Sequence, residues 1–165
     1  MDDKIEKEIK ELEDKLKMPY SFVNTPNVVA NFIRPMIQDK IVCDIGCMVG
    51  VFMDSLKKYA KEVIGVEVEE REYNIAKKRG HNVIFGDGAR IELPKADVYY
   101  VWVHKDMFIP IIENIKNGLI ITGAYWPYPE LQEYLNKMGA ITIEIPDLIN
   151  EFGSKHFFQI NILRK

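Results

Sequence analysis

From residue 40 onward, the chain alternates short apolar segments with amphipathic segments, and this alternation constrains the fold more than any other feature. The segments typical of β-strands are residues 40–44, 61–68, 82–87, 96–103, 119–125, 140–145 and 156–164. The segments with helical periodicity between them are residues 51–60, 69–80, 105–117 and 127–138. Strands that alternate with helices indicate a mostly parallel sheet with helices on its faces. We therefore predict an α/β fold, a three-layer sandwich built around a seven-strand sheet.

The last two strands are an exception to the parallel order. Only residues 146–155 connect them, and this segment shows no helical pattern. A parallel crossover needs about a dozen residues or more, usually with a helix. We therefore expect the last strand to run antiparallel. In such a sheet, a ligand binds beyond the carboxyl ends of the strands, at the switch in strand order.

A charged helix is predicted at the N-terminus, over residues 2–17. Its apolar residues recur at helical spacing and form one stripe, made of Ile5, Ile9, Leu12 and Leu16. We interpret residues 1–17 as an appended helix that docks on the domain by this stripe. A seam in a homodimer and a lid over the site are the alternatives.

A second helix is expected before the first strand. It runs from Pro26 to about Ile37, with Thr25 as its N-cap. Proline is favoured at the first helical position because its missing N–H would have no helical partner there.

Composition limits the class of protein. The 165 residues fit a single domain, 1–165, and the chain has no apolar run long enough for a transmembrane helix, which predicts a soluble protein. The charged N-terminus is unlike a signal peptide, and two cysteines suit a reducing, cytoplasmic location. A net charge of −3 disfavours a dedicated nucleic-acid binder. The abundance of Lys, Glu and Ile resembles the residue usage of thermophiles.

Acidic residues and glycines gather where the predicted strands end. Asp44 and Gly46 end the first strand, and Gly50 opens the helix that follows. Glu67 ends the second strand and Asp87 ends the third. Glycine permits a tight turn and close approach to a ligand, and the helix after Gly50 would direct free N–H groups toward it. These residues are our candidate binding site.

Two details of the first turn separate the ligands that such a site could bind. An acid at the end of the second strand can accept both hydroxyls of a ribose, in NAD sites and in S-adenosyl-L-methionine sites. The NAD fingerprint is G-x-G-x-x-G, whereas this turn reads G-x-x-x-G. Asp44 lies two residues before the first glycine, where it would face the pyrophosphate of a dinucleotide. It suits S-adenosyl-L-methionine, which has an ammonium group and no phosphate.

The segments D-I-G-C-M-V-G, V-I-G-V-E-V and I-F-G-D-G-A resemble, as a series, the motifs of class I, seven-strand S-adenosylmethionine-dependent methyltransferases. The resemblance extends over residues 20–165. It implies that the turn from Asp44 to Gly50 holds the methionine end of the cofactor, that Glu67 binds the ribose and that Asp87 binds the adenine amino group. The cofactor-binding residues implied are Tyr20, Thr25, Asp44, Gly46, Cys47, Gly50, Glu67, Val68, Asp87 and Gly88.

Met48 departs from the family pattern D/E-x-G-x-G-x-G, which has glycine at this place. Catechol-type methyltransferases carry a tyrosine there, so a side chain that points away from the ligand is tolerated. A side chain that fills the methionine site would instead make the chain a non-catalytic binding or interaction protein on the same fold. The enzyme is the favoured interpretation.

A weaker resemblance concerns the methyl acceptor. The segments PYSFVNTPNVVANFI and VYYVWVHKDMFIPIIENIKNG are similar to segments of small archaeal protein-lysine methyltransferases, in which Tyr20 and Thr25 would lie beside the cofactor. This favours a protein lysine or another small nucleophile as the acceptor. An RNA methyltransferase is the alternative. Its basic residues would be those of 57–61 and 77–79, which we interpret as solvated helix faces away from the site.

The sequence leaves the catalytic residue open. His104, after the fourth strand, is a candidate general base, and Tyr125 is a candidate on the wall of a substrate channel. Trp102 either joins that wall or packs in the core. His81 is given no role. Cys43 and Cys47 are the only two cysteines of the sequence, too few for the three that an iron–sulfur triad needs, and two thiols alone do not make a zinc site, so we predict no metal site.

Overall fold

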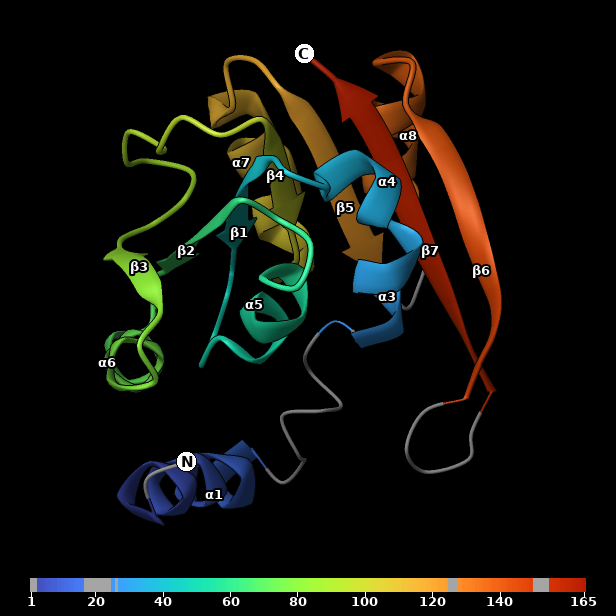
Figure 1. Ribbon diagram of the computed structural model, residues 1–165. Helices are drawn as coiled ribbons and strands as arrows, with labels where there is room; N and C mark the ends of the chain where they lie inside the picture. Colours follow the sequence, from blue (N-terminus) through green and yellow to red (C-terminus); the bar gives the residue numbers. More distant parts are fainter. Residues whose placement is uncertain (1–2, 17–24, 26, 125–127, 150–154) are drawn as a thin grey trace.

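The computed structural model describes residues 3–16, 25, 27–124, 128–149 and 155–165 (Figure 1). Within these residues, seven strands form one sheet in the order β3-β2-β1-β4-β5-β7-β6. The strands are β1 Ile41–Ile45, β2 Glu62–Glu67, β3 Asn82–Phe85, β4 Val98–Val101, β5 Leu119–Ala124, β6 Ile141–Ile149 and β7 Lys155–Arg164. Strands β1 to β5 pair in parallel, whereas β7 is antiparallel to both β5 and β6. The predicted sheet with an antiparallel last strand is confirmed.

Helices cover both faces of this sheet. The described helices are α1 Asp3–Leu16, α3 Asn27–Phe32, α4 Arg34–Ile37, α5 Val51–Leu56, α6 Glu70–Lys78, η1 Lys105–Met107, α7 Phe108–Asn114 and α8 Pro129–Lys137. Successive strand residues alternate between two cores. Val42 and Tyr100 pack in the core under α3, α4 and α5, whereas Cys43 and Tyr99 pack in the core under α7 and α8. The predicted three layers follow from this alternation (Figure 1).

Residues 27–37 form two short helices, so the single helix predicted from Pro26 to Ile37 is wrong. The first ends at Phe32, and the second has Pro35 in its first turn. Proline has no N–H to donate to the carbonyl group four residues earlier, and its ring clashes with that group. The helix is therefore interrupted at Ile33.

The N-terminal helix α1 docks on the domain by its apolar stripe. Ile5 and Leu12 are buried in a cluster with Val49, which belongs to the turn after β1. The Glu8 carboxylate pairs with Lys78 on α6 at 2.7 Å. The sequence allowed three arrangements for this helix, and the structure contains the one in which its apolar stripe docks on the domain. No helix that the structure describes is both long enough and apolar enough to cross a membrane.

Candidate functional site

A cavity of about 370 Å³ opens at the carboxyl edge of the sheet, where β1 lies between β2 and β4. This is the switch in strand order that the sequence predicted as the ligand site. The ends of four strands contribute to it. The lining residues are Ile45, Gly46, Met48, Val66, Glu67, Val68, Glu72, Gly86, Asp87, Gly88, Trp102, Val103, His104, Met107 and Ile111.

The charged side chains around this cavity are all acidic. Glu67, Glu72 and Asp87 border it, whereas none of its described lining residues is Lys or Arg. A phosphate group would therefore find no cation among the described lining side chains, but the hydroxyl and ammonium groups of a ligand would find acceptors. The cavity suits a ligand that carries positive charge and hydroxyl groups.

The turn that joins β1 to α5, residues 46–50, forms one wall and is called the β1–α5 turn below. Gly46 has a left-handed backbone, with φ of 82°. A Cβ atom at Gly46 would overlap the carbonyl oxygen of Trp102, which follows β4. The amide of Gly46 also donates to the carbonyl of Val66 at 2.9 Å, so the turn is pressed between β2 and β4. Glycine is the residue that fits at position 46, because it adopts the left-handed backbone without strain and has no Cβ atom to overlap Trp102.

Met48, in the middle of the β1–α5 turn, also has a left-handed backbone, with φ of 52°. The backbone conformation that glycine favours is therefore retained without the glycine. The Met48 side chain packs against the cluster that contains Ile5 and Leu12 of α1, and the residue also borders the cavity. Met48 is thus shared between α1 and the cavity wall.

Glu67 is a buried carboxylate that already accepts three backbone hydrogen bonds. Oε1 accepts the amides of Val68 and Glu69, and Oε2 accepts the amide of Met48, each at 2.8 Å. Burial raises the pKa of Glu67, and these three bonds oppose the rise. A carboxylate has about four lone-pair sites. One site on Oε2 remains for a ligand, so Glu67 can accept one ribose hydroxyl without losing a backbone partner.

Asp44, at the end of β1, is the most deeply buried acid near the cavity, with 2% of its surface exposed. Its Oδ2 atom has no hydrogen-bond partner among the described residues. Burial, with the nearby charge of Glu67, raises the pKa of Asp44 to about 7. An unpaired buried carboxylate is costly, and a cation placed beside it would relieve that cost.

Asp87, Gly88 and Val68 border the cavity on the side of β2 and β3. Asp87 Oδ1 accepts the amide of Ala89 at 2.9 Å, and Oδ2 lies 3.3 Å from Arg90 Nε. A Cβ atom at Gly88 would lie 2.7 Å from a methyl carbon of Ile45, so glycine permits this close packing.

Four predicted binding residues are not among the described residues that line the cavity: Thr25, Asp44, Cys47 and Gly50. The Thr25 hydroxyl is buried and hydrogen-bonds the Tyr100 hydroxyl at 2.9 Å. The Cys47 side chain belongs to the core and approaches Gly65 of β2. Gly50 packs on the imidazole of His81. Tyr20 and Tyr125, two further candidates, lie outside the residues that the structure describes.

His104 lies at the rim of the cavity with a largely exposed imidazole. Its Nδ1 atom is 3.2 Å from Oδ2 of Asp106. A carboxylate at this distance favours one orientation of the ring, with Nε2 remaining for another partner. Trp102 borders the cavity and also packs against the core, so both interpretations of this residue apply.

Sequence reasoning missed seven lining residues, three of which are Ile45 of β1, Val66 of β2 and Gly86 directly after β3. Glu72 comes from the first turn of α6, and Val103, Met107 and Ile111 follow β4. All seven lie at the ends of β1 to β4 or in the segments that follow them, so they could have been included on topology alone.

The two cysteines are core residues. Burial raises the pKa of both the Cys43 and the Cys47 thiol, so each is held in its neutral form. Among the residues with described placement, no group of three His, Cys, Asp or Glu side chains could hold a metal ion.

The basic residues of 57–61 and 77–79 are not all solvated, contrary to the interpretation from sequence. Arg79 and Lys57 contact buried groups behind the β1–α5 turn, whereas Lys78 pairs with Glu8 of α1. The solvated-face interpretation fails for Arg79, whose side chain is only 11% exposed.

Comparisons with known proteins place the fold. No protein-family model and no curated protein matches the chain. Among solved structures, ribosomal protein L11 methylase from Lactobacillus delbrueckii subsp. bulgaricus superposes with a TM-score of 0.64 and 15% identity, over 84% of this chain and 76% of that one. A TehB-like SAM-dependent methyltransferase from Corynebacterium glutamicum gives 0.63 and 18%, over 86% and 90%.

A third similar structure contains a ligand. Magnesium protoporphyrin IX methyltransferase from Synechocystis PCC 6803, described with bound SAM, superposes with a TM-score of 0.59 and 15% identity, over 84% of this chain and 79% of that one. Identities this low establish fold alone. The chain has the seven-strand α/β fold of these methyltransferase structures.

Proposed function

We propose that the chain is an S-adenosyl-L-methionine-dependent methyltransferase. The observation that carries the proposal is the acidic cavity at the strand switch, whose described lining residues include no Lys or Arg. S-adenosyl-L-methionine offers a sulfonium, an ammonium group and a ribose, and it has no phosphate. The unpartnered carboxyl of Asp44 fits the cationic end of such a ligand. The shared fold of the similar methyltransferases is consistent with this assignment.

The proposed placement of the cofactor follows the strand ends. The methionine end lies along the β1–α5 turn near Asp44, the ribose contacts Glu67, and the adenine lies toward Asp87. Glu67 contributes one hydrogen bond from Oε2, because its other lone pairs are taken by backbone amides. Val68 and Gly88 border the cavity beside these acids. Cys47 and Gly50 act from behind the wall by shaping the turn, and Thr25 acts through its hydrogen bond to Tyr100 on β4.

The acceptor is a protein lysine or another small nucleophile in this proposal. When bound, the cofactor supplies an electrophilic methyl group, and the protein positions the nucleophile and accepts any proton that leaves. His104 at the rim is our candidate base, because Asp106 orients its imidazole. Imidazole is suited to proton transfer near neutral pH.

Calorimetric titration with S-adenosyl-L-methionine, S-adenosylhomocysteine and NAD tests the binding step. We expect the first two ligands to bind and NAD to fail. Incubation with methyl-labelled cofactor and separate protein, RNA and small-molecule fractions then tests transfer. Label in protein supports the lysine acceptor, and label in RNA supports the alternative. Binding without label in any fraction would identify a non-catalytic protein, and no binding at all would reject the proposed function.

A further inference from the structure

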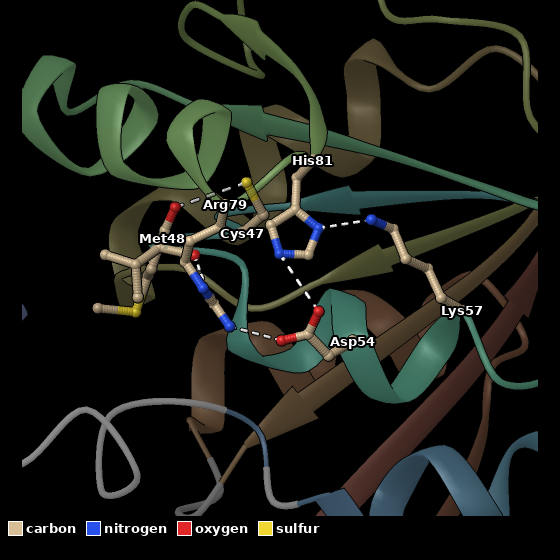
Figure 2. Close-up of polar contacts among 7 residues, drawn as sticks. Cys47, Met48, Asp54, Lys57, Arg79 and His81 are labelled. Carbon is tan, nitrogen blue, oxygen red and sulfur yellow. Dashed lines mark hydrogen bonds and ion pairs between the residues drawn. The ribbon is translucent and has the colours of Figure 1, made fainter. Parts of the chain in front are cut away.

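A cluster of charged residues lies behind the β1–α5 turn, on the side away from the cavity. It consists of Asp54 on α5, Lys57 at the C-terminus of α5, Arg79 at the C-terminus of α6 and His81 before β3 (Figure 2). None of these residues lines the cavity. Their contacts therefore need an explanation other than contact with a ligand.

Arg79 reaches the β1–α5 turn directly. Its Nη1 atom donates a hydrogen bond to the carbonyl oxygen of Val49, and its Nη2 atom pairs with Oδ2 of Asp54 at 2.5 Å. Val49 is fully buried. The guanidinium group thus joins α6, α5 and the turn, because its planar fork offers donors in two directions.

His81 contacts the next residue of the same turn. The imidazole packs so closely on Gly50 that a Cβ atom there would lie 2.5 Å from ring carbon Cδ2. The ring nitrogens face two charged groups: Nδ1 lies 2.8 Å from Lys57 Nζ and Nε2 lies 3.4 Å from Asp54 Oδ1 (Figure 2). A lysine ammonium only donates, so Nδ1 is the acceptor and Nε2 carries the proton, without a hydrogen-bond partner among the described residues.

We propose that Arg79 and Asp54 are positioning residues for the cofactor, which hold the β1–α5 turn in its binding conformation from behind. The proposal rests on the proposed function, because the ligand is S-adenosyl-L-methionine. The turn needs such support because Met48 has a left-handed backbone, which a non-glycine residue adopts only at an energetic cost. Arg79 fixes the carbonyl of Val49 directly after Met48, and Asp54 orients Arg79.

Substitution of Arg79 by glutamine tests the proposal, with Lys78→Gln as the matched control. Both changes remove one positive charge, at the last residue of α6 and at the residue directly after it, but the ion pair of Lys78 is with Glu8 of α1. Titration with S-adenosylhomocysteine is carried out well below the unfolding temperature. We expect Arg79→Gln to weaken binding about tenfold or more. Lys78→Gln should change the affinity less than about twofold, and equal effects of the two variants would overturn the proposal.

Asp54→Asn is the second variant, because it keeps the size of the side chain and removes the charge that orients Arg79. It should weaken binding in the same direction, and Arg79→Lys should restore part of the affinity lost in Arg79→Gln. A purely structural role would lower the unfolding temperature and leave the affinity of the folded protein unchanged. If both Asp54→Asn and Arg79→Gln lower the unfolding temperature and leave the affinity unchanged, the inference is overturned but the proposed function is not. Absence of binding in the unmodified protein overturns both.

Discussion

The amide of Met48 donates a hydrogen bond to Oε2 of Glu67 over 2.8 Å. This bond joins the middle of the β1–α5 turn to the end of β2, and it depends on the left-handed backbone at Met48. Only side chains that tolerate a left-handed backbone can therefore occupy position 48. The missing glycine therefore alters what the turn contacts more than it alters the path of the backbone.

Replacement of Met48 by glycine or valine separates backbone from side chain. Valine is β-branched and strongly disfavoured at a φ of 52°, so Met48→Val should lower the free energy of unfolding by more than about 1 kcal/mol. Met48→Gly relieves the strain and loses the packing of the side chain against the cluster that contains Ile5 and Leu12. Urea denaturation of both variants measures the difference. Valine as stable as glycine would contradict the left-handed assignment.

Glu67→Gln should weaken both folding and cofactor binding. The uncharged Gln amide keeps one acceptor oxygen. Its NH₂ group takes the place of the other oxygen, where it would face a backbone N–H that donates to the Glu67 carboxylate in the unmodified protein. Hydrogen bonds to charged groups contribute about 1.5–3 kcal/mol each, so we expect losses of that order in stability and affinity. Calorimetry and urea denaturation measure the two effects. The control is Glu69→Gln, at an exposed neighbouring acid. Unchanged affinity in Glu67→Gln would remove the ribose assignment.

Cofactor binding should release a proton from Asp44 below neutral pH. Burial and the charge of Glu67 raise the pKa of Asp44 to about 7, so the carboxyl of the free protein is largely protonated below that pH. A cationic ligand favours the ionised form. The affinity should therefore fall as pH decreases below about 7, by up to about tenfold per pH unit. Titrations between about pH 5.5 and 8 measure the slope. Asp44→Asn should bind weakly with a flat profile, and a flat profile in the unmodified protein contradicts the assignment.

His81 should destabilise the folded protein in acid. Burial, and then the charge of Lys57, lowers the pKa of His81 to about 4, while Asp54 opposes and Arg79 reinforces this shift. The unfolded chain takes up the proton near its ordinary pKa of about 6.5. The contribution of His81 to stability therefore decreases as pH falls from about 6.5 to about 4, on the order of 2 kcal/mol in all.

The measurement is the free energy of unfolding of the unmodified protein and of His81→Asn over this pH range. Asp44 contributes with the opposite sign, because its raised pKa makes stability fall as pH increases toward about 7. Comparison of the two proteins at each pH cancels that contribution. The difference between them should change with pH in His81→Asn. A constant difference for His81→Asn would show that the ring titrates as it does in the unfolded chain.

The fold and the location of the site could be predicted from local pattern, because strands and the acids at their ends are read from consecutive residues. Asp44, Glu67 and Asp87 lie where topology places them. The interruption at Ile33 was also readable, since Pro35 is incompatible with a continuous helix.

Other features depend on contacts between distant residues, and no local pattern encodes them. The imidazole of His81 meets Gly50 across 31 positions of the chain, and nothing around His81 in the sequence indicates burial. Of the three amides on Glu67, that of Met48 likewise comes from a distant position, 19 residues earlier in the chain. The folded structure was needed to see that the Glu67 carboxylate has one acceptor site left for a ligand.

The packing of α1 on the β1–α5 turn has a consequence for how related sequences diverge. Met48 packs against a cluster to which α1 contributes Ile5 and Leu12, so the N-terminal helix supplies part of the apolar surroundings of its side chain. A descendant that lost this helix would expose an apolar side chain to water at a position where the backbone already favours glycine. We therefore expect the residue at position 48 and the helix to be inherited, or lost, together.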